Sequence, residues 1–365
     1  MKKCKLLFAL IALLASFLLP IQTRGEGSGY ALDSPSHILR PFLGEGGDLS
    51  EIESLGEEFG ISALFGEVMA SVGAGIGRVG SFFLLLLALA LLSSVLSSAS
   101  PSAVWGAGLD AGITLVFSAA VFSRLYPLLE SVKSSISELS VFFSSLIPIF
   151  SGALASSGNL KSAASEVVLM NIVLICVGTI TEKILLPLCY ALFFISMTSG
   201  VDLGVSSVLT KKLKGFFIWT CGLSSAILIG ASSMQGLIAS SADGAYLRAA
   251  KFAASGTIPV VGSAVSSLLG TLGGGLAIMK SAVGGVSVYL LLSYSLAPLI
   301  ILLLYKLCLA LATMILEFSG SGGGVRVFSA FSSSLDAVIA VYVTSCAVYL
   351  SEILIFVRCG VSYFG

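Results

Sequence analysis

The feature that most constrains this chain is a series of long apolar runs between residues 81 and 357. A helix needs about 20 apolar residues to cross the roughly 30 Å hydrocarbon core of a bilayer. Eight runs approach that length, and they are Ser81–Ser97, Leu109–Leu129, Leu139–Leu154, Val167–Thr181, Ile184–Val201, Gly215–Ile238, Val283–Leu304 and Ala337–Val357. Hydrocarbon cannot form hydrogen bonds, so a spanning segment must pair all of its backbone groups within the protein. Because the runs lack the alternation of polar and apolar residues of a transmembrane barrel, we expect helices.

The shorter runs leave the number of spans open. Leu139–Leu154 contains Pro148, and only Glu182 and Lys183 separate the fourth run from the fifth. The fourth and fifth runs are therefore either a tight hairpin or one bent element. The predicted fold is an all-α polytopic transmembrane bundle of 6 to 8 spans that occupies residues 80–365.

The composition excludes several classes of protein. Apolar residues make up 56% of the chain and charged residues 10%, and the mean hydropathy is +1.06. Soluble domains carry about 25% charged residues. The 19 basic and 19 acidic side chains cancel, so no bulk field attracts a nucleic acid. These values indicate a membrane protein and exclude a disordered chain, a nucleic-acid binder and a disulfide-stapled secreted domain.

The N-terminal 79 residues predict export. Three lysines within residues 1–5 precede the apolar run Leu6–Leu19, so we expect a signal peptide over residues 1–25, with a retained anchor helix as the alternative. Residues 26–79 hold nearly half of the acids and have helical periodicity, most clearly from Ile61 to Val79. We interpret them as an exported amphipathic segment that lies on the membrane surface or docks on a partner, or as two helices packed on each other.

One basic cluster predicts the topology of the membrane domain. Lys211, Lys212 and Lys214 lie between the fifth and sixth runs, and the positive-inside rule places them in the cytoplasm. With the preceding segment outside, the number of crossings before the cluster must be odd. Either both weak runs cross the membrane or neither does. After one more crossing, residues 240–255 lie outside.

The residue inventory argues against an enzyme. The only histidine is His37, in the exported segment, so neither a Ser-His pair within the membrane nor an H-E-x-x-H zinc site can form. The glycine run Gly320–Gly324 lacks the Lys-Ser/Thr of a phosphate-binding loop. The seven cysteines form no C-x-x-C pair and suit packing. We expect no catalysis, no cofactor and no metal.

The most unusual stretch is a charged block between apolar runs. It contains Asp243, Arg248 and Lys251, and it leads into Pro259 and Gly262. In one interpretation Asp243 caps a short helix and the two cations favour the negative end of its dipole. In the other the cluster is functional, because charges wedged between membrane spans are costly.

A glycine-rich segment follows the block. Gly262–Gly285 contains the small-residue pattern Gly270-x-x-x-Gly274, and Lys280 lies near its end. Small residues let helices approach closely, which we favour. The alternative is a broken helix that lines a polar path, as in transporters.

The order of these features, and the block in particular, resembles the stage III sporulation protein AE family of endospore-forming bacteria. The residues that carry the resemblance are Ala242-Asp243-Gly244, Leu247-Arg248, Ala250-Lys251-Phe252 and Ile258-Pro259-Val260-Val261-Gly262. The resemblance implies a multi-pass protein of the mother-cell membrane around the forespore. It also implies partners among other sporulation-stage membrane proteins.

The function that the resemblance implies is that of a non-enzymatic subunit of the channel, or secretion-like, complex between mother cell and forespore. The alternative is an autonomous permease for a small solute, with a path lined by Asp243, Arg248, Lys251 and Lys280. Recovery of the protein only as a homo-oligomer would favour this alternative.

Overall fold

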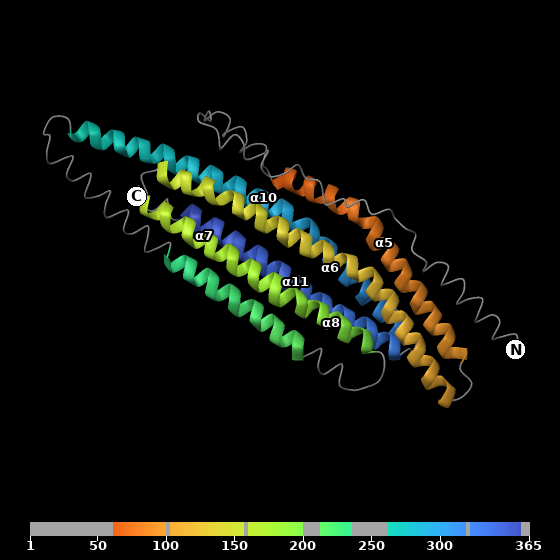
Figure 1. Cartoon of the computed structure of the whole chain (residues 1–365). Coiled ribbons are helices and arrows are strands. Elements are labelled where there is room, and N and C mark those ends of the chain that lie inside the picture. The colour runs from red at the N-terminus through yellow and green to blue at the C-terminus, as the bar shows by residue number, and fades with distance from the viewer. Residues whose placement is uncertain are drawn as a thin grey trace.

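The computed structural model describes residues 61–99, 103–156, 160–199, 212–235, 262–318 and 322–358. Its elements are α5 (Ile61–Ala99), α6 (Ala103–Ser156), α7 (Leu160–Ile180), η1 (Thr181–Leu185), α8 (Leu186–Thr198), the helix Lys212–Gln235, α10 (Gly262–Phe318) and α11 (Gly322–Arg358). The long helices lie side by side in an elongated bundle (Figure 1). No strand occurs in the described part, which confirms the predicted all-α architecture.

Six helices in the described ranges are long and apolar enough to cross a membrane, the lower limit of the predicted range. The predicted boundary inside α6 is wrong, whereas between the fourth and fifth runs the alternative of one bent element is confirmed. Leu109–Leu129 and Leu139–Leu154 belong to one helix, α6, because Pro148 interrupts neither its backbone nor its direction enough to end it. Transmembrane helices tolerate proline where neighbouring groups satisfy the freed carbonyl.

The fourth and fifth predicted spans also form one bent element. A π-helical turn, η1, joins α7 to α8, and the amide of Leu186 donates to the carbonyl of Thr181 five residues earlier. The turn contains both Glu182 and Lys183. Such single π turns bend a helix without ending it. The chain therefore does not form a hairpin at Glu182 and Lys183. One continuous span runs over Ala163–Thr198.

Contacts between aromatic rings fix the directions of neighbouring helices. Phe143 and Phe150 of α6 stack on Tyr349 and Phe356 of α11, with ring centroids 4.7 and 3.8 Å apart. Both partners advance by seven residues, so α6 and α11 run parallel. Stacked aromatic pairs contribute about 0.5–1.5 kcal/mol beyond the burial of their area.

Hydrogen bonds show that α8 runs against α11. Ser196 bonds Ser334 at 2.7 Å, and Thr181 bonds Ser345 at 3.3 Å, so residue numbers fall along one helix as they rise along the other. The directions alternate as expected if each helix crosses once. Three helices then precede Lys212, and this odd number agrees with the predicted topology when neither weak run is counted as a separate span.

Many of the described serine hydroxyls donate to carbonyl groups of their own helices. Ser118 donates to the carbonyl of Leu115 at 2.8 Å, Ser140 to that of Ile136 at 3.0 Å, and Ser287 to that of Val283 at 2.8 Å. This local bond removes the cost of placing a hydroxyl in an apolar bundle. A sequence rich in serine can therefore form transmembrane helices.

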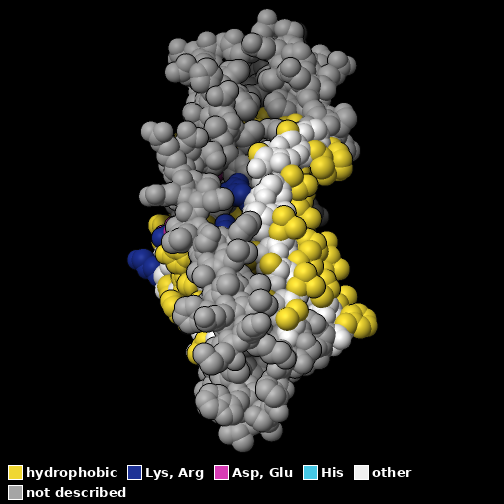
Figure 2. Space-filling view, turned by 90° about the vertical axis from the view of Figure 1, so that its right-hand side faces the viewer, with side chains coloured by type: hydrophobic (Ala, Val, Ile, Leu, Met, Phe, Trp, Pro, Cys, Tyr) yellow, Lys and Arg dark blue, Asp and Glu magenta, His cyan; other side chains and the backbone are white. Residues whose placement is uncertain are grey.

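Large apolar side chains cover both the interior and the outside of the bundle. Phe82, Phe193 and Phe331 are among the fully buried side chains, whereas Leu84 and Ile175 are exposed. Figure 2 shows hydrophobic side chains in a long strip over the described surface. An apolar exterior is what a helix bundle presents to lipid.

The predicted boundary at residues 79 and 80 falls inside α5, which runs unbroken from Ile61 to Ala99. The stripe Ile61–Val79 is thus the first half of a long helix. It packs on α10, where Val68 and Val72 contact Ala297. The predicted signal peptide and the acidic residues 26–60 lie outside the described residues.

Candidate functional site

A groove with several polar side chains in a mostly apolar lining runs between α5 and α6, with α10 beside both. The α5 helix packs mainly on α10 and touches α6 little. Two small cavities of about 10 and 60 Å³ lie in the space between the three helices, and both are lined by Pro298. We call these two adjoining cavities the central groove.

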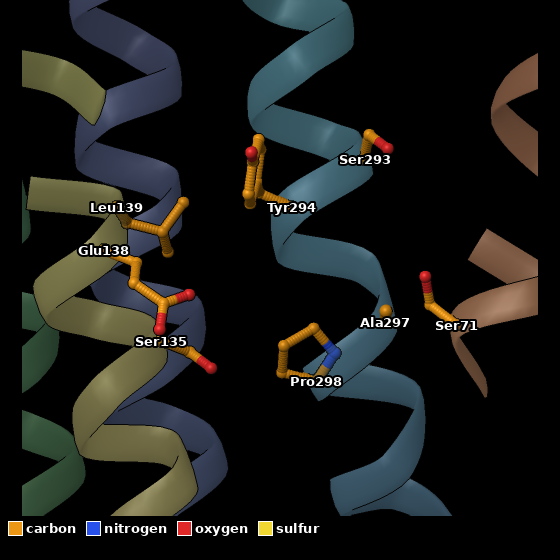
Figure 3. A pocket seen from close by; sticks show the side chains of 8 residues that line it. All are labelled: Ser71, Ser135, Glu138, Leu139, Ser293, Tyr294, Ala297 and Pro298. Carbon is orange, nitrogen blue, oxygen red and sulfur yellow. The ribbon is translucent and has the colours of Figure 1, made fainter. Parts of the chain in front are cut away.

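Side chains from one face of each helix line the central groove. The contributors from α5 are Ser71, Gly75 and Arg78; those from α6 are Arg124, Pro127, Leu128, Ser131, Val132, Ser135, Glu138 and Leu139; those from α10 are Ser293, Tyr294, Ala297, Pro298, Ile301 and Tyr305. Within each helix these positions recur at three- and four-residue intervals, which keeps them on one face. Figure 3 shows Ser71 on one side of α10 and Glu138 on the other.

The groove lies at the middle of all three spans. Arg78 has 14 span residues before it and 15 after it in Leu64–Ser93, a span of 30 residues. Ser135 is one of the two middle residues of the 42-residue span of α6, and Ile301 is one of the two in the 36-residue span of α10. Polar groups at this height are unfavourable in lipid, by about 2.5–3.5 kcal/mol for an arginine.

The larger cavity has two arginines in its wall. Arg78 from α5 and Arg124 from α6 line it, together with the hydroxyl-bearing Ser131 and Tyr305. Both arginine side chains are exposed, so they stand at the open side of the groove. Guanidinium groups bind carboxylates and phosphates with two parallel hydrogen bonds. This part of the groove can hold an anionic group.

The smaller cavity has serine and carboxylate groups. Glu138 accepts a hydrogen bond from Ser134 at 3.0 Å, and Ser135 donates to the carbonyl of Ser131 at 3.0 Å. The hydroxyl of Ser293 is buried, and no described residue forms a hydrogen bond with it. In Figure 3 the Ser293 side chain projects from α10 on the side nearer α5. The smaller cavity thus offers one hydroxyl that is unpaired within the described part of the chain.

Two prolines lie beside the cavities at this height. Pro127 is inside α6 and Pro298 is inside α10. A proline has no amide hydrogen and displaces the carbonyl four residues before it, which locally opens the helix. Paired irregularities at mid-span are typical of helices that line a polar path.

The middle of α6 carries a charged outer face beside the groove. Glu130, Lys133 and Glu138 are exposed there within nine residues, and the hydroxyl of Tyr190 in α8 donates to Glu130 at 2.6 Å. The face separates the two apolar halves of the helix. Because lipid does not solvate such a face, water or another protein must meet it.

A cluster of charged side chains joins three helices near the start of the Lys212–Gln235 helix. Asp336 of α11 forms ion pairs with Lys214 and with Lys306 of α10. All three side chains are partly exposed. Lys214, predicted as a topology signal, is thus also a structural link. Lys212 begins its helix and is exposed, and Lys211 lies outside the described residues.

Most of the predicted charged block cannot be placed. Asp243, Arg248, Lys251 and Pro259 lie outside the described residues, so their role stays a prediction. Gly262 is the first residue of α10. The backbone at Lys280 is in the same helix.

The glycine-rich segment belongs to a continuous helix, which argues against the alternative of a broken helix. Close packing is confirmed at one position. A Cβ atom on Gly284 would overlap Cγ2 of Val357, so α10 and α11 approach closely here because Gly284 has no side chain. Gly285, by contrast, has open space around its Cα.

The residues of the central groove and the acids of α11 were not predicted from the sequence. A signal was available for α6, because Glu130 to Glu138 form the polar gap between the runs Leu109–Leu129 and Leu139–Leu154, and Arg124 is a charge inside the first of them. Pro298 lies inside the apolar run Val283–Leu304. Asp336 directly precedes the last predicted span, and Glu352 lies inside it.

Comparison with known proteins gives one consistent result. The sequence profile described as stage III sporulation protein AE matches residues 45–360. The stage III sporulation protein AE of Bacillus subtilis (strain 168) is 24% identical over 336 residues, which cover 92% of this chain and 82% of the relative. No solved structure matches.

Proposed function

Because the chain belongs to the stage III sporulation protein AE family, and so has a role in sporulation as a multi-pass membrane protein, we propose that it is a non-enzymatic subunit of a membrane complex. In this proposal the complex is the channel, or secretion-like, apparatus between mother cell and forespore. The protein resides in the mother-cell membrane around the forespore. Its partners are other sporulation-stage membrane proteins.

The central groove is the observation that carries this proposal. It places Arg78, Arg124 and Glu138 at the middle of membrane-spanning helices, on surfaces that a lipid tail cannot satisfy. A partner segment with an acidic or amide-bearing face would bind the exposed guanidinium group of Arg124. The exposed charges of α6 beside the groove extend the same surface. These features suit a subunit that is completed by another protein.

Crosslinking from inside the groove tests the proposal. A photoreactive amino acid at Ser131, in the wall of the larger cavity, should crosslink to another sporulation-stage protein in sporulating cells. The matched control is Ile172, an exposed apolar residue of α7 that should crosslink to lipid. Equal yields of protein adducts from both positions, or none from Ser131, would contradict the groove as a partner surface.

The groove also favours the second candidate, an autonomous permease. Prolines and charges at mid-span are features of transport paths as well. Replacing Arg124 by Gln separates the candidates, because a complex subunit then loses its partners whereas a permease keeps its assembly and loses solute flux. Replacing Arg248 or Lys251 by Ala makes the same distinction for the predicted charged block.

A further inference from the structure

A second polar site lies in the bundle on helices other than those of the central groove. Glu352 of α11 is 0% exposed, and neither of its carboxylate oxygens has a hydrogen-bond partner in the described part of the chain. Glu166 of α7 is 5% exposed and lies close enough to Glu352 for the two carboxyl groups to interact. The Ser232 hydroxyl, from the Lys212–Gln235 helix, is 2% exposed and also lies near Glu352, without the geometry of a hydrogen bond. Three helices thus meet around one carboxyl group.

The surroundings of Glu352 on its own helix are aromatic. One turn further along α11, Phe356 stacks on Phe150 of α6 with centroids 3.8 Å apart. One turn before, the hydroxyl of Tyr349 is bonded to Ser140 at 2.9 Å. From α10, the backbone at Gly284 meets Val357. Neither α6 nor α10 supplies a described cation that acts on Glu352.

An ionised carboxylate is strongly disfavoured in such a place. Removing it from water costs several kcal/mol even after the protein relaxes, and a second carboxylate nearby adds repulsion. Glu352 forms no ion pair with any described side chain. A metal ion would need more donors, since Ca²⁺ takes about 6–8 oxygen ligands. No group of three His, Cys, Asp or Glu residues in the described ranges is placed to hold one.

We propose that Glu352, with Glu166 and Ser232, forms a buried proton-binding site in which Glu352 is held as the neutral acid. The carboxyl proton is then available to Ser232 or Glu166 as a hydrogen-bond donor. When this proton leaves, α11 carries a buried negative charge at Glu352, beside the Glu166 carboxyl group of α7. The site therefore links proton occupancy to the packing of α7, α11 and the Lys212–Gln235 helix.

The proton-binding site lies beside a contact between α7 and the Lys212–Gln235 helix, which a change in proton occupancy would affect. Gln235, the last described residue of its helix, donates to Ser165, next to Glu166, at 3.2 Å. The chain continues from Gln235 toward the predicted charged block of Asp243 to Gly262. A change in proton occupancy would act first on the contact between Gln235 and Ser165.

Infrared difference spectroscopy of the full-length protein in lipid vesicles tests the proposal at neutral pH. Subtracting the spectrum of E352Q from that of the wild type should give the C=O stretching band of a protonated carboxylic acid, which shifts in D₂O. The matched control is E138Q, in the open groove, where the difference should contain carboxylate bands. A wild-type minus E352Q difference made of carboxylate bands would overturn the proposal.

Two further measurements keep the test decisive. If E352Q does not fold, E166Q serves instead, because removal of the neighbouring charge should shift the pH at which the Glu352 acid band disappears, and an unchanged pH would overturn the three-residue site. Carboxylate bands of Glu352 that move when K⁺ is replaced by Na⁺ would identify a metal cation as the occupant and overturn the proton.

Discussion

At the scale of single residues, the packing of the bundle depends on a glycine that lets two helices approach and on polar side chains whose bonding groups are paired. Gly284 lets α10 and α11 touch, and Asp336 holds two lysines from different helices. Serine hydroxyls such as those of Ser118 and Ser140 donate to backbone carbonyls of their own helices. Ser293 and Glu352, whose buried polar atoms have no hydrogen-bond partner among the described residues, are exceptions to this pattern.

Replacing Gly284 by Ala should destabilise the protein by about 1–3 kcal/mol, because the new methyl group overlaps the stiff, β-branched Val357. The measurement is denaturant or thermal unfolding of the purified full-length protein in detergent. Gly285→Ala is the matched control and should stay within about 1 kcal/mol of the wild type, since nothing lies near its Cβ. Equal effects of the two changes would refute the close contact, and added Val357→Ala should rescue only Gly284→Ala.

Replacing Asp336 by Asn should cost about 1–2 kcal/mol of unfolding free energy, between the values for exposed and buried ion pairs. The reason is that Lys214 and Lys306 then repel each other without the central anion. Adding Lys306→Met to Asp336→Asn should recover part of the loss. Strict additivity of the two changes in an unfolding experiment would show that the cluster does not stabilise the fold.

At the scale of elements, the sequence predicted the presence of helices better than the positions where they begin, end or bend. Apolar composition predicted Val283–Leu304 and Ala337–Val357 correctly as parts of α10 and α11. Hydropathy alone split α6 in two, because a polar middle lowers the average although the backbone continues. The π-helical turn at Thr181–Leu185 depends on a hydrogen-bond shift that no residue type specifies.

The central groove was harder to predict for the same reason. Two of its three walls, those of α5 and α10, come from positions more than 200 residues apart, such as Ser71 and Ser293. Periodicity gives the face of each helix but not which helices meet. Only the prolines and the charged residues inside apolar runs indicate, from the sequence, where along the helices the groove lies.

The charged face of α6 should be accessible to water or to a partner rather than to lipid. In protein freed of its native cysteines and reconstituted in vesicles, Ser137→Cys should react with a membrane-impermeant maleimide at least about tenfold faster than Ile175→Cys, because thiolate forms in water. Ile175 is a fitting control, since it is 65% exposed on an apolar face. Equally slow reaction at both positions would place the face of α6 against lipid.

At the scale of the whole molecule, the alternating helix directions make a prediction about sidedness. The start of the Lys212–Gln235 helix and the end of α10 at Phe318 should lie on one side of the membrane, and the end of α6 at Ser156 on the other. Single cysteines at these positions, labelled from outside in right-side-out vesicles, check this. Lys212→Cys and Phe318→Cys should stay protected while Ser156→Cys reacts. Any other grouping would contradict the crossing order.

The central claim is that this member of the stage III sporulation protein AE family works as a partner-bound membrane subunit whose central groove contacts another protein. The most direct measurement is crosslinking and affinity recovery of the tagged full-length protein from sporulating cells, followed by mass spectrometry, for the wild type, Arg124→Gln and the control Lys183→Gln. Lys183 is an exposed cation of η1, away from the groove.

We predict that other sporulation-stage membrane proteins are recovered with the wild type and with Lys183→Gln, and that their yield falls at least about tenfold with Arg124→Gln at an unchanged level of the protein itself, as for loss of an interaction of about 1.4 kcal/mol or more. Recovery of the wild-type protein alone, or only as a homo-oligomer, would contradict the account and favour the permease.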